Sequence, residues 1–312
     1  MTELPTGYLA RAPQPRDAAA VAEVVKAHDI ADYGEPDFTH EDLVDDWMRP
    51  RFDLSSDAWV LTGPTGRIIG YAYVWESHPD AELEADAFVM PEYAGRGLGG
   101  QLLEIIEARA RAICGDRAMT LGMFASGAND DKRNLLERRG FVFVRSVLRM
   151  RIDLSREPVP APAPGAEVTI GSLDPVDLDA VRTVWLDAFS EHGRFSPRRM
   201  DEWLASRFEH PAFDPSLWRV ATIGGEIVGA ISVFDVGDTG YTSTVAVRAS
   251  SRGHGIGPAL VRAAFSALRD RGQMRVVVSL DADDGGLLGL YEAAGMRVHE
   301  RHDWFVKSLG PA

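Results

Sequence analysis

Residues 245–268, VAVRASSRGHGIGPALVRAAFSAL, run from an apolar strand-like segment through a glycine-rich turn into an amphipathic helical pattern. In the turn, Gly253, Gly255 and Gly257 alternate with other residues. Glycine lets a backbone approach a ligand closely, and the N–H groups at the start of the following helix converge on one point. Such a point suits a phosphate group. Arg252 adds a fixed positive charge that can pair with a phosphate oxygen.

The same order of segments occurs twice in the chain. DAWVLTGPTGRIIGYAYV (57–74) and SLWRVATIGGEIVGAISV (216–233) each predict two strands joined by a glycine-containing turn. Further on, PEYAGRGLGG (91–100) precedes a helical pattern as ASSRGHGIGP (249–258) does, and LLERRGF later matches LYEAAGM. An ordered repeat of this length predicts two copies of one α/β domain.

The spacing between matched residues supports a duplication. Gly229 lies 159 residues after Gly70, and Gly295 lies 155 residues after Gly140. Small loop deletions after duplication explain this slow drift. Between the copies, alternating prolines predict an extended linker. We therefore expect a first domain over 1–154, a Pro-rich linker over 155–166 and a second domain over 167–312.

Composition limits the classes of function. The 312 residues are 45% hydrophobic and 26% charged, which is typical of globular domains, and the net charge of −14 argues against nucleic-acid or anionic-membrane partners. The single cysteine, Cys114, has no partner for a disulfide or a metal cluster, and the histidines lack metal-ligand spacing, so no metal is expected. No signal peptide or long apolar run is present, which favours a cytoplasmic location.

Two other phosphate-binding motifs fit the turn less well. A Walker loop ends in Gly-Lys-Ser/Thr, which neither copy has. The first copy, from Gly95 to Gly100, formally satisfies G-x-G-x-x-G. A dinucleotide site also needs an acidic residue after the next strand, and MTLGMFASG offers none; the second copy has Pro258 in place of the third glycine. A dinucleotide-binding fold is therefore disfavoured.

These residues resemble the GCN5-related N-acetyltransferase (GNAT) family. Arg252, Gly255 and Gly257 match the family's motif Arg/Gln-x-x-Gly-x-Gly/Ala between a strand and a helix. Leu290, Tyr291 and Gly295, in the stretch LYEAAG, match its closing pattern Leu-Tyr-x-x-x-Gly. The resemblance covers both halves. It implies an α/β fold of two tandem GNAT-like domains, each a mixed, mostly antiparallel sheet flanked by helices.

The resemblance also implies a site and a reaction. Acetyl-CoA would serve as co-substrate, with its pyrophosphate on the turn and its pantetheine along the preceding strand, which gives the cofactor-binding set Val245, Val247, Arg252, Gly253, His254, Gly255, Ile256 and Gly257. An amine would attack the thioester directly, and Tyr291 would act as general acid toward the departing thiolate. A half-buried aromatic that only packs the last helix is the alternative for Tyr291.

The general base is less well defined. Tyr241 stands where the family often has a glutamate that acts as base. Asp238 and Asp235 are near in sequence, and we take Asp238 as the candidate base, with a solvated loop acid as the alternative. Asp284 stands where the family often has asparagine, and a carboxylate there would either repel CoA or form a local hydrogen bond.

The two copies differ in residues that carry chemistry. Ala94 replaces the motif arginine in the first copy, and Leu136 replaces Tyr291. We therefore expect a catalytically silent N-terminal domain and a C-terminal domain that acetylates a primary amine of a small molecule. The alternatives are a non-catalytic acyl-CoA-binding sensor or scaffold and an enzyme like mycothiol synthase, which the two-domain architecture resembles. The oligomeric state, monomer or homodimer, stays open.

Overall fold

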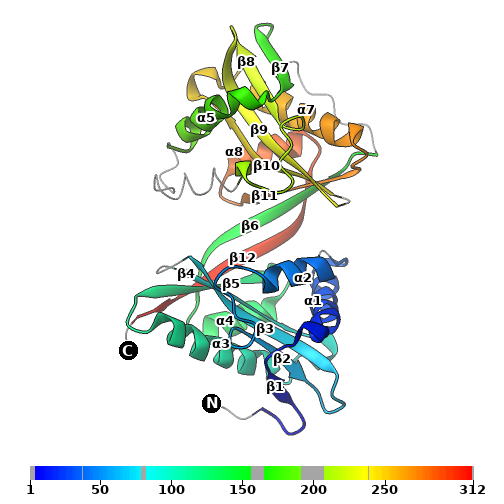
Figure 1. Ribbon diagram of the computed structural model, residues 1–312, viewed down its shortest axis with the longest axis vertical. Helices are drawn as coiled ribbons and strands as arrows, with labels where there is room; N and C mark the ends of the chain where they lie inside the picture. The colour runs from blue at the N-terminus through cyan, green and yellow to red at the C-terminus, as the bar shows by residue number, and fades with distance from the viewer. Residues whose placement is uncertain are drawn as a thin grey trace. The chain divides into compact units, whose positions relative to one another are not determined.

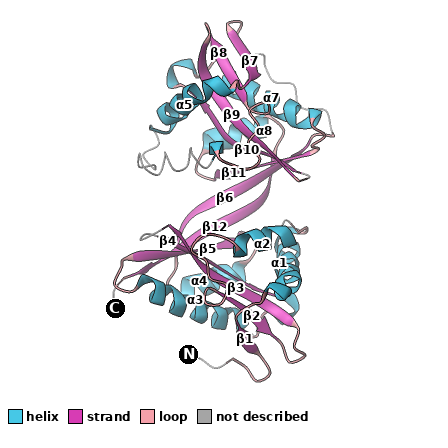
Figure 2. Ribbon diagram, in the orientation of Figure 1, coloured by secondary structure: helices cyan, strands magenta, loops and turns pink. Residues whose placement is uncertain are grey.

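The computed structural model describes residues 4–36, 38–78, 82–155, 165–190, 207–237 and 239–310. Contacts divide the chain into two compact units, which Figure 1 shows. Unit 1 comprises residues 1–147 and 300–312, and unit 2 comprises residues 148–299. Each unit is a mixed, mostly antiparallel sheet with helices packed on it (Figure 2), so the predicted fold class is confirmed.

Unit 1 has the sheet order β1-β2-β3-β4-β5-β12, in which only β4 and β5 pair in parallel. The strands are β1 (Leu9–Arg11), β2 (Ala58–Thr62), β3 (Ile68–His78), β4 (Glu82–Val89), β5 (Met119–Ser126) and β12 (Arg297–Leu309). The helices are η1 (Pro15–Asp17), α1 (Ala18–Tyr33), α2 (His40–Trp47), η2 (Pro91–Tyr93), α3 (Leu98–Cys114) and α4 (Asp130–Arg138). One apolar cluster joins α1 and α2 to the sheet, and another joins α3 to it.

Unit 2 repeats this plan with the order β7-β8-β9-β10-β11-β6, and β10 and β11 pair in parallel. Its strands are β6 (Val142–Asp153), which begins in unit 1, β7 (Val168–Ser172), β8 (Arg219–Ile223), β9 (Glu226–Val236), β10 (Thr239–Val247) and β11 (Arg275–Asp281). Its helices are η3 (Pro175–Asp177), α5 (Leu178–Ser190), η4 (Ala249–Ser251), α7 (Ile256–Asp270) and α8 (Gly285–Ala293). Trp185 and Trp218 lie fully buried in its core.

The two copies exchange their last strands. β12 ends the second copy in sequence but pairs antiparallel with β5 of unit 1, from His302 opposite Ser126 to Leu309 opposite Met119. β6 ends the first copy in sequence and continues into unit 2, where it neighbours β11. The compact units therefore differ from the division expected at 1–154 and 167–312, which follows the sequence repeat. Residues 156–164 of the expected linker lie outside the described residues.

Specific contacts fit β12 to unit 1. The Trp304 ring covers Gly122 of β5 so closely that a Cβ atom there would lie 1.9 Å from it. The Asp303 carboxylate is fully buried, accepts a hydrogen bond from Ser146 Oγ at 2.6 Å and lies 3.3 Å from Arg133 Nε. A buried charge needs such partners, because an unpaired one is costly to desolvate.

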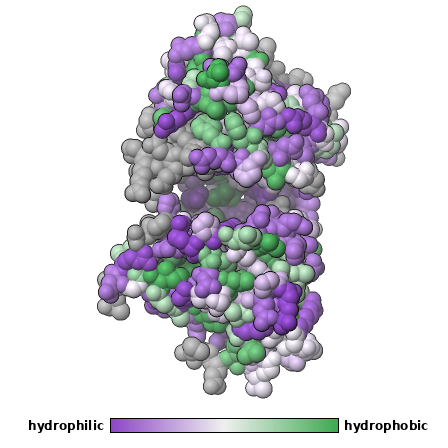
Figure 3. All heavy atoms as spheres, viewed as in Figure 1, coloured by the Kyte–Doolittle hydropathy of each residue, from purple (hydrophilic) through white to green (hydrophobic). Residues whose placement is uncertain are grey.

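The visible surface of both units mixes polar and apolar residues, as is usual for globular proteins (Figure 3). Among the described residues, no helix is both long enough and apolar enough to cross a membrane.

Candidate functional site

The glycine turn of unit 2 has the conformation that the sequence predicts. Gly253 and Gly255 have φ angles of 83° and 72°, in the left-handed region that favours glycine. Gly255 is the N-cap residue of α7, so the first N–H groups of that helix point out of the turn. Arg252 is exposed and extended, and its Nε donates a hydrogen bond to the Val247 carbonyl at 3.2 Å. This bond fixes the base of the guanidinium over the end of β10.

His254 contributes to the turn itself. Its Nδ1 lies 3.2 Å from the Ser251 carbonyl oxygen and 3.0 Å from that of Arg252, so a proton on Nδ1 bridges two carbonyls of the turn. Its own carbonyl accepts a hydrogen bond from Gly165 N at 3.2 Å. His254 thus orders the backbone around Gly253 rather than facing a second titratable group.

β10 separates from β11 beside this turn. The two strands pair over Thr239–Tyr241 of β10, although β10 continues to Val247. On its other side β10 pairs with β9, with a bulge between Thr242 and Val245. Beyond Tyr241, the edge of β10 that faces β11 therefore has no pairing with β11 among the described residues. Val245 and Val247 of this stretch are half-buried.

Tyr291 lies at this point of the site. Its side chain is 1% exposed, and burial raises the pKa of its phenol to about 12. The Thr242 hydroxyl lies beside the phenol, although neither oxygen completes a hydrogen bond with the described residues. Leu290 packs 3.6 Å from where a Cβ of Gly257 would stand, so α8 contacts the start of α7. The structure brings the phenol, the opened strand and the glycine turn together in one unit.

The acidic candidates have different outcomes. Asp238, the expected base, lies outside the described residues. Asp235 accepts a hydrogen bond from Gln273 Nε2 at 2.5 Å, which ties it to the start of β11. Asp284 caps α8 by accepting a hydrogen bond from Leu287 N at 3.0 Å. The carboxylate of Asp284 therefore has the local role, rather than facing the turn unsatisfied.

The first copy preserves the turn but lacks the arginine before it and the tyrosine of the later helix. Gly95 and Gly97 have φ angles of 75° and 78°, and Gly97 is the N-cap residue of α3. Ala94 occupies the position of the arginine, and Leu136 is fully buried at the position of the tyrosine. The strand β4 pairs with β3 without a bulge over residues 84–89, unlike β10 with β9.

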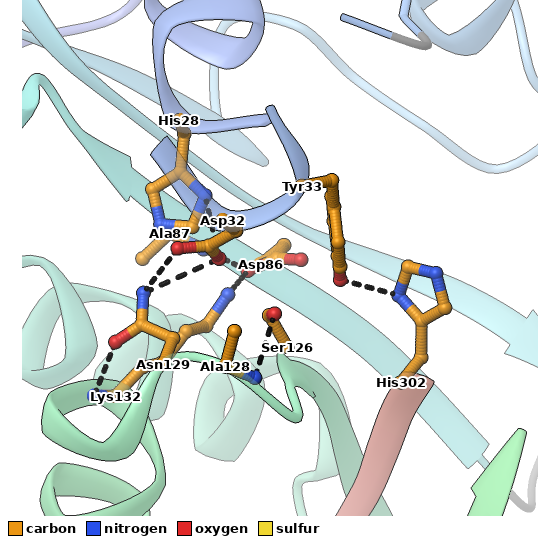
Figure 4. Close-up of polar contacts among 10 residues, drawn as sticks. All are labelled: His28, Asp32, Tyr33, Asp86, Ala87, Ser126, Ala128, Asn129, Lys132 and His302. Carbon is orange, nitrogen blue, oxygen red and sulfur yellow. Dashed lines mark hydrogen bonds and ion pairs between the residues drawn. The ribbon is translucent and has the colours of Figure 1, made fainter. Parts of the chain in front are cut away.

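Unit 1 instead contains a polar network that the sequence analysis missed. Side chains from α1, α4, β4 and β12 meet around the end of β5 (Figure 4). Tyr33 Oη lies 3.0 Å from His302 Nδ1, and Asn129 Nδ2 donates to Asp32 at 3.2 Å. No motif joins these residues, because α1, α4 and β12 are far apart in sequence. The one available signal is the alternating acids of β4, Glu82, Glu84 and Asp86.

The fold and site define a class: paired α/β units in which a strand opens beside a glycine turn at a helix start. The Acetyltransferase (GNAT) family model matches residues 23–141 and 178–296, one region in each copy. The chain belongs to this family and is a tandem GNAT N-acetyltransferase. Enzymes of this family use acetyl-CoA and acetylate amine acceptors.

Among curated relatives, the mycothiol acetyltransferase of Catenulispora acidiphila is 28% identical over 253 residues, which cover 77% of this chain and 79% of that protein. The mycothiol acetyltransferase of Cellulomonas flavigena is 30% identical over 251 residues, covering 76% of this chain and 71% of that protein. Both similarities span most of the two copies.

Two solved structures share the tandem arrangement over the whole chain. A GCN5-related N-acetyltransferase from Sphaerobacter thermophilus has 30% identity and a TM-score of 0.84, covering 99% of this chain and 98% of that one. A tandem GNAT protein from the clavulanic acid biosynthesis pathway has 17% identity and a TM-score of 0.71, covering 98% and 99%. The second likeness concerns the fold alone.

Proposed function

We propose that unit 2 transfers an acetyl group from acetyl-CoA to a primary amine of a small molecule, and that unit 1 is silent in this transfer. One observation carries the proposal: among the described residues, unit 2 alone combines an arginine directly before the first turn glycine, an opened strand and a buried tyrosine on the helix after the parallel strand. Unit 1 has the turn and the opened strand, but Ala94 and Leu136 replace the cation and the phenol.

The residues of unit 2 fit acetyl-CoA. A Cβ atom on Gly253 would have no neighbour within 4 Å, so the space over the turn is open to a ligand. The N–H groups around Gly255 and the Arg252 guanidinium suit a pyrophosphate. The unpaired edge of β10 near Val245 and Val247 suits the amides of pantetheine, as an added strand suits a sheet edge. When bound, acetyl-CoA supplies the thioester whose acyl group is transferred.

The side chains of unit 2 then handle position and protons. The turn and Arg252 hold the phosphates, which fixes the thioester relative to β10. Tyr291 keeps its proton throughout the neutral pH range because its pKa is about 12. Its phenol is therefore a hydrogen-bond donor and proton source for charge that develops on the departing sulfur. Asp238, which lies between β9 and β10 in the sequence, is proposed to take the proton of the attacking amine.

For the acceptor, we propose the amine class used by the relatives named mycothiol acetyltransferase. Relatives with this name match more than two thirds of this chain and of their own length. The identity of 28–30% supports the class of reaction, while the loops that read the acceptor can differ at this distance. An activity like that of those relatives is therefore a more specific form of the same proposal.

Calorimetric titration with acetyl-CoA tests the assignment of the site. We expect one site in the wild-type protein and affinity at least tenfold weaker in Arg252→Ala, since a charge-assisted contact is lost. Arg96→Ala is the matched control, because Arg96 belongs to the first copy's turn, where its guanidinium lies 4.9 Å from the Tyr93 ring centroid. Two comparable sites, or an unchanged affinity in Arg252→Ala, would refute the proposal.

Thiol release with a panel of primary amines then separates the enzyme from a binding protein. We expect release that depends on both acetyl-CoA and an amine. Tight binding without release for any amine would instead support an acyl-CoA-binding sensor or scaffold.

A further inference from the structure

The polar network of unit 1 has an order that fixes which groups donate and which accept. Glu300 is 5% exposed, and its Oε2 lies 2.9 Å from His302 Nε2. A carboxylate only accepts, so Nε2 carries a proton, and in the neutral tautomer with its proton on Nε2 the other nitrogen, Nδ1, is an acceptor. Tyr33 must then donate its O–H to Nδ1, at 3.0 Å. The remaining lone pairs of the Tyr33 oxygen are left as acceptors.

Asp32 is a buried carboxylate that forms no ion pair with a lysine or arginine among the described residues. Its side chain is 10% exposed and contacts Asn129 Nδ2 at 3.2 Å and His28 Nδ1 at 3.4 Å. Burial lowers the pKa of His28 to about 3, so this imidazole is neutral at physiological pH. Burial also raises the pKa of Asp32 itself. This nine-tenths buried carboxylate thus has neutral groups as its direct partners and no cation in contact among the described residues.

The ammonium group that acts on Asp32 among the described residues, that of Lys132, is already paired. Lys132 forms an ion pair with Asp86, and its Nζ lies 5.2 Å from the centroid of the Phe88 ring. The carboxylates of Asp32, Glu300 and Asp29 all add to the effect of burial in raising the pKa of Tyr33. With the Lys132–Asp86 pair neutral overall, the surroundings of the Tyr33 oxygen are anionic and favour a cation.

Three oxygens converge in these surroundings. Ser126, at the end of β5, accepts a hydrogen bond from Ala128 N at 3.1 Å, and its hydroxyl lowers the pKa values of both Asp32 and Tyr33, so it lies beside both. Figure 4 shows Ser126 between the Asp32–Asn129 pair and the Tyr33–His302 pair. One carboxylate and two hydroxyl oxygens match the three N–H donors of a primary ammonium group.

The repeat itself does not need these polar groups. Counted from the matched glycines Gly140 and Gly295, Val147 and Arg145 of the first copy's last strand correspond to His302 and Glu300. A strand at this position of the domain thus forms without the imidazole and the carboxylate. Buried ionisable groups that the fold can omit, and that cost desolvation energy, are candidates for a function.

We propose that Asp32, Tyr33 and Ser126 of unit 1 form a binding site for a small compound with a primary ammonium group. The site binds the amine without acetylating it, because unit 1 lacks the arginine and the tyrosine of the transfer site. It adds a second amine site to the enzyme, held in shape by His302 and Glu300 from the exchanged strand. A single carboxylate with two hydroxyls distinguishes it from a metal centre, for which the described residues offer no group of three ligands.

Ethanolamine is a probe small enough to enter the site, and choline is its matched control because a quaternary ammonium has no N–H donor. The whole chain is titrated by NMR at about pH 8, where an unperturbed imidazole is neutral and an alkyl ammonium is charged. Acetyl-CoA is left out, so the result is independent of transfer by unit 2. We expect the ring signal of His302, identified by its loss in His302→Gln, to shift and saturate with ethanolamine and to stay unchanged with choline.

Variants locate the response. Asp32→Asn should weaken binding roughly 10- to 100-fold and Tyr33→Phe roughly tenfold, as expected for lost charged and neutral hydrogen bonds. Glu23→Gln removes the same charge at an exposed position of α1 and should leave ethanolamine binding unchanged. A response to choline or K⁺ equal to that of ethanolamine, no saturable shift at all, or normal binding in a folded Tyr33→Phe would each overturn the proposal.

Discussion

The two glycine turns of this chain share a backbone and differ in their side chains. Residue 94 has φ and ψ of −59° and 158°, and Arg252 has −70° and 158°; the glycines that follow each have positive φ. Yet the first copy has alanine where the second has the cation. Glycines and helix starts therefore preserve the shape of the turn where the arginine before it is missing, so the shape identifies the fold, and the side chains are the basis for proposing which copy is active.

The opened strands show a second difference. Glu84 of β4 pairs with Gly122 at the position where Tyr241 of β10 pairs with Val277. The first copy thus has a glutamate at this position, whose pKa is raised by burial, while the second copy has Tyr291, the proposed general acid, and the bulge. Chemical groups of this kind are divided between the copies instead of being lost from one copy only.

The largest expected effect separates the copies by chemistry. Tyr291→Phe should lower kcat roughly 100-fold or more while changing the KM for acetyl-CoA little, since a general acid acts mainly in the transition state. Stability should not fall, because the phenol oxygen completes no hydrogen bond with the described residues. Steady-state thiol release and thermal unfolding measure both quantities.

Tyr93→Phe is the control, because Tyr93 belongs to the first copy's turn. It should leave kcat unchanged. Equal losses in the two variants would mean that the copies share the chemistry, and an unaffected Tyr291→Phe would remove the tyrosine from the mechanism.

The next effect tests the exchange of strands. Gly122→Ala places a Cβ atom 1.9 Å from the Trp304 ring, so β12 must shift away from β5. We expect a loss of about 3 kcal/mol in the free energy of unfolding of unit 1, at the upper end for overpacking. Urea unfolding followed by tryptophan fluorescence measures it.

Gly171→Ala in β7 of unit 2 is a matched control, because no atom lies within 4 Å of its added Cβ. If Gly122→Ala is as stable as this control, β12 does not pack on β5, and the compact units follow the sequence repeat after all.

This exchange marks the limit of what the sequence could predict. The repeat, the turn conformation and the position of Tyr291 follow from local patterns: glycine spacing, helix starts and apolar periodicity. β6 and β12 have similar patterns, and nothing local decides which copy's sheet accepts each strand. The contact of Trp304 with Gly122 fits β12 to the sheet of unit 1, but these two residues are 182 positions apart in the sequence. The polar network could not be predicted for the same reason, because His302 contacts Tyr33 only when the exchanged strand β12 pairs with β5.

The smallest expected effect compares the turns directly, through Gly95→Ala and Gly253→Ala. Both glycines have positive φ, 75° and 83°, and neither added Cβ would have an atom within 4 Å. The strain of placing alanine in this region, about 1 kcal/mol, should thus lower stability equally in the two variants. Acetyl-CoA affinity should fall only in Gly253→Ala, because only that turn is proposed to hold the pyrophosphate.

Calorimetry and thermal unfolding on the same samples separate the two quantities, and each variant is the control for the other. A fall in acetyl-CoA affinity in Gly95→Ala as large as in Gly253→Ala would show that the first turn also binds the nucleotide, and Ala94 would then be no barrier to binding. Unequal losses of stability with equal φ would instead mean that surrounding contacts, and not the glycine conformation, preserve the turn in the first copy. Because the backbone strain is the same in Gly95→Ala and Gly253→Ala, a difference in acetyl-CoA affinity between them reflects contact of the turn with the ligand and not a change in folding.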